Sequence, residues 1–327
     1  MPARVTAVRP TRAVESGRIV LEGTGFPVDG PRLPEVQIGG ASARVVQASS
    51  SALSVIVPSG LDGGPTPIRV EGARGETPFV DVAAPLATGL HQVDNPVFDR
   101  EGNLYVTYSG TRGQQVPVSI FKVRPNGTRE TFSSGIVNAT SMAMDAHGRL
   151  YVSSRFEGTV YRVAPDGSFE PFATDLGIAC GLAFSKTGEL FVGDRSGTIF
   201  RVDESGKATA FATLPSSVAA FHLAIAPDGY IWLTAPTLST YDPIYKVAPD
   251  GVVSTVDVKF GRPQGIAFNP GGEPYVVEAL AGASGVYRIA SDNSLELVVA
   301  GPNLIGLAFD LFGNMVVCSG ETAYRLK

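Results

Sequence analysis

The sequence is poor in several residue types that define common classes of protein. It contains two cysteines and three histidines in 327 residues, and no apolar run reaches the length of a membrane-spanning helix. The chain is therefore not expected to span a membrane. The three histidines are dispersed along the chain, so a three-histidine metal site is not expected. A glycine-rich phosphate-binding loop is also missing.

Basic residues are outnumbered by acidic ones. The chain has 26 Lys and Arg against 31 Asp and Glu, which gives a formal net charge of −5. This balance argues against a nucleic-acid partner, whose phosphates require a basic surface. The N-terminus carries several arginines but no apolar segment of the kind found in secretion signals. The two cysteines, Cys180 and Cys318, are interpreted as buried and inert thiols.

Glycine and proline are abundant, and they separate many short apolar runs. The chain has 38 Gly and 24 Pro, a composition that predicts an all-β fold with many turns. Six copies of one apolar pattern occupy residues 95–99, 141–145, 181–185, 222–226, 265–269 and 306–310. A glycine turn follows each copy, and successive turn glycines are 40 to 46 residues apart. A repeat of this length indicates a repeat architecture.

The third copy shows the complete unit. Its apolar runs cover residues 181–184, 189–193, 198–202 and 208–212. Four antiparallel strands in about 40 residues describe one blade of a β-propeller. The sixth copy ends after its third run. We therefore expect a six-bladed propeller over residues 84–327, closed by a strand from about residues 80–88 that completes the last blade.

The first 83 residues follow a different pattern. Short alternating runs at residues 19–22, 35–38, 43–46, 53–57 and 67–70 predict a two-sheet sandwich. The motifs Gly23-Thr-Gly-Phe26, Val36-Gln-Ile-Gly-Gly40 and Pro67-Ile-Arg-Val70 resemble the IPT/TIG immunoglobulin-like domain. In that resemblance, residues 1–83 form an interaction or spacer unit without chemistry of its own.

The repeats resemble NHL repeats and the gluconolactonase (senescence-marker) propellers. Members of the lactonase family hold a divalent cation, such as Ca²⁺, with a carboxylate and two other oxygen-bearing side chains. By the strand pattern, the carboxylate position falls on Asp94, and two asparagine positions fall on Thr140 and Cys180. The catalytic aspartate position falls on Phe221, whose ring neither binds a cation nor acts as a base. His222 is adjacent, but alternation along a strand predicts that it points to the other side.

A functional surface is expected where the inner strands begin. Long loops at 109–119, 235–243 and 279–285 are expected on this face, together with polar side chains at the ends of strands. The candidate ligand-binding residues are Asp94, Asn95, Thr140, Ser141, Arg155, Cys180, Asp194, Arg195, His222, Gln264 and Glu278. Asp94 and His222 are also the candidate catalytic residues, and Asp94 is the candidate metal ligand. Asn126-Gly-Thr128 and Asn138-Ala-Thr140 match the glycosylation sequon.

These observations favour a non-catalytic recognition or scaffold protein over an enzyme. The expected partner is a protein, a peptide or a glycan on the propeller face, and the chain is expected to be a monomer. One alternative is a divalent-metal-dependent lactonase or esterase that uses Asp94. Another is a purely structural repeat protein in an envelope assembly. The domain pairing favours an extracytoplasmic location, although the sequence shows no export signal.

Overall fold

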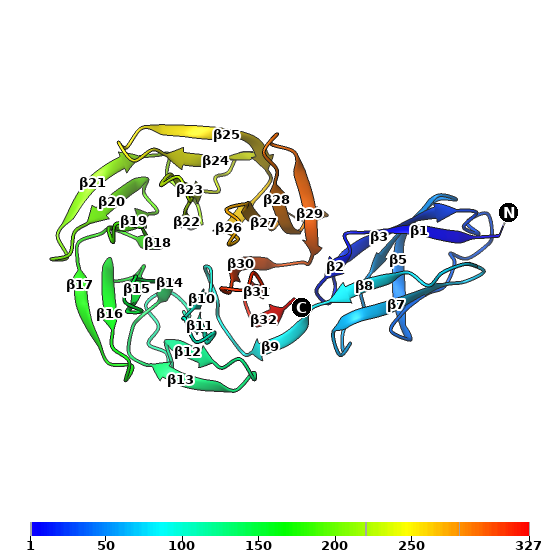
Figure 1. The fold of residues 1–327 in the computed structure, drawn as a ribbon, viewed down its shortest axis with the longest axis horizontal. Coiled ribbons are helices and arrows are strands. Elements are labelled where there is room, and N and C mark those ends of the chain that lie inside the picture. Colours follow the sequence, from blue (N-terminus) through cyan, green and yellow to red (C-terminus); the bar gives the residue numbers. More distant parts are fainter. Residues whose placement is uncertain (1, 220, 281, 327) are drawn as a thin grey trace.

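The fold is built from strands and turns, with no helix among the described residues. The computed structural model describes residues 2–219, 221–280 and 282–326. Figure 1 shows a ring of sheets around a common centre and a smaller group of N-terminal strands beside the ring. In these ranges, no helix is long and apolar enough to cross a membrane.

Five separate four-stranded sheets form blades of the ring (Figure 1). Within each sheet, successive strands pair in the antiparallel direction, as alternation of apolar runs and glycine turns predicts. The first blade contains β10 (Val97–Phe98), β11 (Leu104–Thr107), β12 (Ile120–Val123) and β13 (Arg129–Ser133). The second contains β14 (Ala139–Met144), β15 (Leu150–Ser154), β16 (Thr159–Val163) and β17 (Phe169–Ala173). The third contains β18 (Ala179–Phe184), β19 (Leu190–Asp194), β20 (Thr198–Val202) and β21 (Ala208–Thr213).

The two remaining separate blades lie farther along the chain. One contains β22 (His222–Ile225), β23 (Ile231–Thr234), β24 (Asp242–Val247) and β25 (Val253–Phe260). The other contains β30 (Leu304–Phe309), β31 (Met315–Ser319), β32 (Thr322–Arg325) and β9 (Ala84–Thr88). Strand β9 pairs antiparallel with β32, with Thr88 opposite Thr322 and Ala87 opposite Ala323. The predicted closing strand is therefore confirmed over Ala84–Thr88, and it joins the two ends of the ring. Residues 80–82 of the predicted range belong instead to β8 (Phe79–Val82) of another sheet.

A twelve-stranded sheet contains the rest of the strands. Its N-terminal members are β1 (Arg4–Arg9), β2 (Arg12–Ala13), β3 (Arg18–Thr24), β4 (Val36–Ile38), β5 (Ala41–Ala48), β6 (Ala52–Ile56), β7 (Gly64–Val70) and β8 (Phe79–Val82). Its other end is formed by β26 (Pro263–Phe268), β27 (Pro274–Glu278), β28 (Gly285–Ile289) and β29 (Leu295–Ala300).

This sheet corrects the predicted division into a separate sandwich and six blades. The strands β26–β29 were predicted as a blade of their own, and they do lie between β22 and β30 around the centre. They are nevertheless continuous with the N-terminal strands, because Ala13 of β2 pairs in parallel with both Val82 and Ala300. The Val14 amide also donates a hydrogen bond of 2.9 Å to the Ala300 carbonyl. This short bridging strand was not predicted from the sequence.

The N-terminal strands bury an apolar core, which includes Ile19, Leu21, Ile38 and Leu53 together with Ala300 of β29. Phe26 of the motif Gly23-Thr-Gly-Phe26 lies in this core, and Gly25 before it has a φ of 68°, which an L side chain rarely adopts. At the centre of the ring, two inner-strand glycines leave no space for a larger side chain. A Cβ at Gly181 would lie 2.3 Å from the Phe221 carbonyl oxygen, and one at Gly306 would lie 2.5 Å from that of Asp94. Glycine therefore lets neighbouring inner strands approach closely.

Candidate functional site

The predicted site residues lie at one end of the ring, which we call the top face. It is the end at which the inner strands β10, β14, β18, β22, β26 and β30 begin and the second strands β11, β15, β19, β23, β27 and β31 end. The opposite end, with the turns between first and second strands, is the bottom face. Because a rigid sheet fixes both ends of each strand, side chains at these positions are held in defined places.

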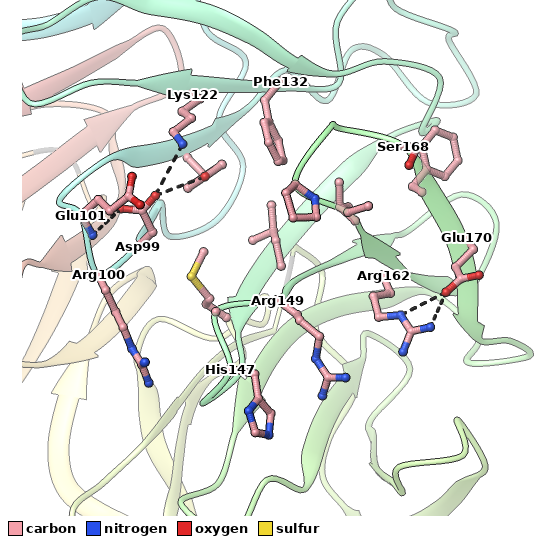
Figure 2. Close-up of a pocket in the computed structure, with 18 residues that line it drawn as sticks. Asp99, Arg100, Glu101, Lys122, Phe132, His147, Arg149, Arg162, Ser168 and Glu170 are labelled. Carbon is pink, nitrogen blue, oxygen red and sulfur yellow. Dashed lines mark hydrogen bonds and ion pairs between the residues drawn. The ribbon is translucent and has the colours of Figure 1, made fainter.

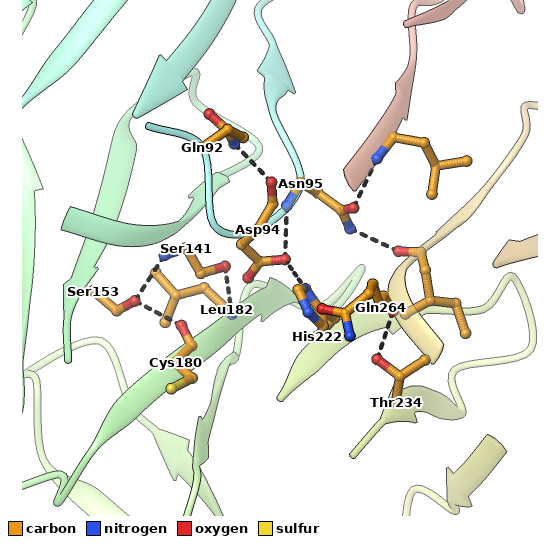
Figure 3. A network of polar contacts seen from close by, with 12 residues as sticks. Gln92, Asp94, Asn95, Ser141, Ser153, Cys180, Leu182, His222, Thr234 and Gln264 are labelled. Atoms are coloured by element: carbon orange, nitrogen blue, oxygen red, sulfur yellow. Dashed lines mark hydrogen bonds and ion pairs between the residues drawn. The ribbon is translucent and has the colours of Figure 1, made fainter. Parts of the chain in front are cut away.

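A buried pair joins two distant sheets beneath the top face. Nδ1 of His222, the first residue of β22, lies 2.5 Å from Oδ1 of Asp94, which precedes β10 (Figure 3). Both side chains are almost completely buried. The Asn95 amide donates to the same carboxylate oxygen at 2.7 Å, and the Gln92 side chain donates to the Asp94 carbonyl. Asp94 is therefore held by its own segment and by the partner strand.

This arrangement corrects the expected orientation of His222. Side chains do alternate along the strand, but Phe221 is the residue that enters the core beside Gly193. His222 points toward Asp94. An Asp–His pair can orient a general base, and Nε2 of His222 has no hydrogen-bond partner among the described residues. The imidazole has no exposed surface, however, so in this conformation the pair connects sheets and does not face a substrate.

Two other candidates connect neighbouring inner strands (Figure 3). The Asn95 side chain donates to the Ile266 carbonyl at 2.8 Å and accepts from the Leu307 amide at 3.0 Å. Oγ of Ser141 accepts from the Leu182 amide at 3.0 Å. Both residues also line a cavity of about 450 Å³ between the inner strands. Their hydrogen-bonding groups are thus directed to backbone partners in other strands.

Three more candidates bind backbone groups near their own strands. Oγ1 of Thr140 donates to the Asn138 carbonyl at 2.8 Å. Oδ1 of Asp194 accepts from the Ile178 and Ser196 amides. Glu278 accepts from three amides that belong to Gly261, Arg262 and Leu280. These buried side chains stabilise loops of the top face, and their polar atoms are already engaged.

The described residues do not fit a lactonase-type cation site. The Asp94 carboxylate is shared by His222 and the Asn95 amide, and Thr140 directs its hydroxyl group to a carbonyl. Phe221, which stands where the lactonase resemblance places a catalytic aspartate, contributes only carbon atoms. Within the described ranges, no group of three His, Cys, Asp or Glu residues is placed to hold a metal ion. Hard cations require several converging oxygen ligands, which this set does not provide.

Cys180 is buried beside this network. Burial, assisted by the negative charge of Asp94, raises the pKa of its thiol to about 11. Burial also raises the pKa of Cys318. We expect that neither thiol reacts with Ellman's reagent at about pH 8 in the folded protein, because the thiolate is the reactive form. Both should react in urea. Rapid labelling of either thiol in the native protein would contradict this assignment.

Two arginines remain available on the top face. Arg155 follows the end of β15, Arg195 follows the end of β19, and both are partly buried. Burial, together with the positive charges of Arg195 and Arg112, lowers the pKa of Arg155. Burial and the charge of Arg155 also lower the pKa of His91. Sequence reasoning did not select Arg112 or His91, because only the fold brings their segments beside Arg155.

The long loops of the top face are anchored by buried polar side chains. Asn138 accepts from the Gly113 amide at 2.7 Å and donates to the Ser109 and Thr111 carbonyls, so it fixes the loop 109–119. Asp242 accepts from the amide and the hydroxyl group of Thr237 at 3.0 and 2.7 Å. These anchors were missed, since Asn138 is recognisable in the sequence only as part of a sequon.

The loop between β23 and β24 presents apolar side chains to solvent. Leu238 is 89% exposed and Tyr241 is 59% exposed, although Asp242 at the start of β24 is buried. The loop after β15 likewise exposes Phe156. Of the remaining candidates, Gln264 accepts a hydrogen bond from Thr234 through its carbonyl, and its side-chain amide has no partner in the described part of the chain. The top face therefore combines anchored loops, exposed apolar groups and unpaired cations.

A separate groove of about 780 Å³ lies between the first two blades, toward the bottom face (Figure 2). Its charged side chains largely pair with one another, as in the contact of 3.7 Å between Lys122 and Asp99. A similar groove of about 940 Å³ separates the sheet β22–β25 from β26–β29. Such grooves are thus a recurring feature of adjacent sheets, and we do not assign a site there.

No protein-family model matches this sequence, and neither does any curated protein. Solved structures are similar to it at low sequence identity. An auxiliary nutrient binding protein from Bacteroides ovatus is 14% identical, with a TM-score of 0.58, over 99% of this chain and 98% of that protein. A gluconolactonase from Xanthomonas campestris is 16% identical, with a TM-score of 0.59, over 75% and 89% of the two chains. A virginiamycin B lyase from Staphylococcus aureus is 12% identical, with a TM-score of 0.54, over 74% and 97%.

These similarities establish a β-propeller and extend no further than the fold. Neither the IPT/TIG resemblance nor the NHL resemblance is shown by them. The similar structures include a binding protein and enzymes, and one fold commonly carries unrelated functions. The arrangement is compatible with a scaffold and with a hydrolase, and the choice between them depends on the residues of the top face.

Proposed function

We propose that this protein is a non-catalytic recognition protein that binds a protein, peptide or glycan ligand on the top face. The observation that carries the proposal is the anchoring of long loops by buried Asn138, Asp242 and Glu278. A loop whose conformation is fixed before binding loses less entropy when the ligand arrives. Exposed Leu238 and Tyr241 on such a loop provide apolar contact area, which is typical of binding sites.

The polar side chains favour recognition over hydrolysis. A lactonase-type reaction needs a cation or a general base that the substrate reaches. Asp94 and His222 are paired beneath the surface, and Cys180 holds its proton at neutral pH. The proposal therefore assigns no divalent cation to Asp94. We also propose that the protein is a monomer, that it lies outside the cytoplasm and that it binds no nucleic acid.

We also propose that residues 1–83 act as a spacer or docking unit of the IPT/TIG kind and that residues 84–327 act as the binding unit. An apolar core formed by residues of the N-terminal strands, with Ala300 as its one member from the ring, supports this division. In the same proposal, β26–β29 complete a six-membered, NHL-like ring, because β26 lies between β22 and β30. The bridge through β2 then holds the binding unit against the N-terminal strands.

The experiment is a screen of glycan and peptide arrays followed by affinity measurement on the ligands that bind. We expect the double substitution Leu238→Ser/Tyr241→Ser to weaken binding about tenfold or more, since exposed apolar anchors carry much of the energy of an interface. The matched control is Leu311→Ser/Phe312→Ser on the bottom face, where Leu311 is 70% exposed and Phe312 is 90% exposed. Equal loss of affinity in both variants, or loss only in the control, would contradict the proposal.

A further inference from the structure

The arginines of the ring divide by face. Those away from the top face have partners in the protein, either a carboxylate or a backbone carbonyl. They are Arg100, Arg124, Arg129, Arg149, Arg162, Arg201, Arg288 and Arg325. Arg112, Arg155, Arg195 and Arg262 make no ion pair and no side-chain hydrogen bond with any described residue. All four lie in loops or strand ends of the top face.

Three of these arginines gather on neighbouring blades, and we call Arg112, Arg155 and Arg195 the arginine cluster. Arg155 and Arg195 occupy equivalent positions, one residue beyond the ends of β15 and β19. The loop that carries Arg112 reaches the same place, because a Cβ at Gly113 would lie 3.1 Å from the ring of Phe156. Phe156 adjoins Arg155 in sequence. Burial lowers the pKa of Arg155, and the positive charges of Arg195 and Arg112 add to this effect.

The nearby carboxylates do not neutralise this cluster. Asp94 is paired with His222. Asp194, which precedes Arg195, accepts from the Ile178 and Ser196 amides and from the Ser196 hydroxyl group. Partly buried guanidinium groups that repel one another are a destabilising arrangement unless an anion is bound between them. The protein therefore carries uncompensated positive charge at one fixed place.

We propose that the arginine cluster binds the anionic group, a carboxylate or a phosphate, of the ligand recognised on the top face. The inference rests on the proposed function and adds the charge of the ligand to it. The guanidinium fork matches the oxygens of either group and forms two parallel hydrogen bonds with them. Exposed Phe156 beside Arg155 would contact the apolar or ring-bearing part of the ligand next to its anionic group.

The test uses the whole chain, with inorganic phosphate and glucuronate as anionic probes and glucose as the neutral comparison. Saturable shifts of the arginine side-chain NMR signals are expected with both anions and not with glucose, and the affinity should fall with added salt. Arg155→Gln/Arg195→Gln should weaken binding of the anions about tenfold or more. The control variant is Arg44→Gln/Arg69→Gln, which changes two exposed residues of β5 and β7. It changes the net charge by the same amount and should leave the affinity for the anions unchanged.

Equal affinity of the cluster variant and the wild-type protein for phosphate and glucuronate would overturn the inference, as would equal loss in the control variant. The array ligands distinguish this failure from failure of the proposed function. If binding of the array ligands is still weakened by Leu238→Ser/Tyr241→Ser but is normal in the cluster variant, recognition on the top face stands and the anion site is wrong. If the relative strength of phosphate and glucuronate differs, the stronger probe identifies which group the ligand carries.

Discussion

Replacement of His222 by alanine lowers the free energy of unfolding by about 3–5 kcal/mol, the range found when one partner of a buried pair is removed. The change leaves Asp94 buried without its contact of 2.5 Å to the imidazole, and it leaves a cavity beside the inner strands. Loss of the imidazole should also weaken the connection between the segment before β10 and the start of β22. Urea denaturation monitored by the fluorescence of Trp232 and by circular dichroism measures the effect.

Two companion variants separate the pair from simple loss of volume. His222→Asn keeps a donor near the position of Nδ1, so it should recover part of the stability. The double substitution Asp94→Ala/His222→Ala should be less destabilising than the sum of the two single changes, because each removes the same interaction. Additive effects of the two single changes, or a cost below about 1 kcal/mol for His222→Ala, would contradict a stabilising pair.

Substitution of Ala87 by aspartate is expected to destabilise the protein by about 3 kcal/mol or more, since it places a charge in an apolar environment without a partner. Ala87 is buried and lies opposite Ala323 in the pairing of β9 with β32. Its neighbours in the core include Leu104, Val106 and Val316. The charge would therefore separate the strand that joins the two ends of the ring. Thermal and urea denaturation measure the change.

The adjacent residue provides the matched control. Thr88 is in the same strand and is exposed, so Thr88→Asp should change stability by no more than about 0.5 kcal/mol. If β9 did not close the ring, both Ala87→Asp and Thr88→Asp would be tolerated. Comparable stability of the Ala87→Asp and Thr88→Asp proteins would thus contradict closure by β9.

Local sequence patterns predicted much of this architecture. Glycine turns and apolar runs located the strands of the blades, and the missing fourth run of the last repeat pointed to the closing strand β9. These features depend on neighbouring residues and on a regular period. The bridge through Ala13 was not predicted, because two residues carry too little pattern to indicate a parallel pairing with Ala300. That bridge is what merges the N-terminal strands with β26–β29.

The site was predicted less completely than the fold, for a related reason. The candidate residues lie near strand ends, and their partners are far away in the sequence. The pairing of Asp94 with His222 and the gathering of Arg112 beside Arg155 follow from the closed ring and not from any local motif. Asn138 anchors a loop that precedes it by more than twenty residues, so its role is visible only in three dimensions.

The measurement that tests the recognition hypothesis most directly is hydrogen–deuterium exchange with and without the tightest ligand from the glycan and peptide arrays. Binding on the top face predicts slower exchange in loops 109–119 and 235–243 and little change in the bottom-face turns 99–103, 145–149 and 310–314. Protection confined to those bottom-face turns would contradict the account. So would turnover of the bound ligand by the wild-type protein.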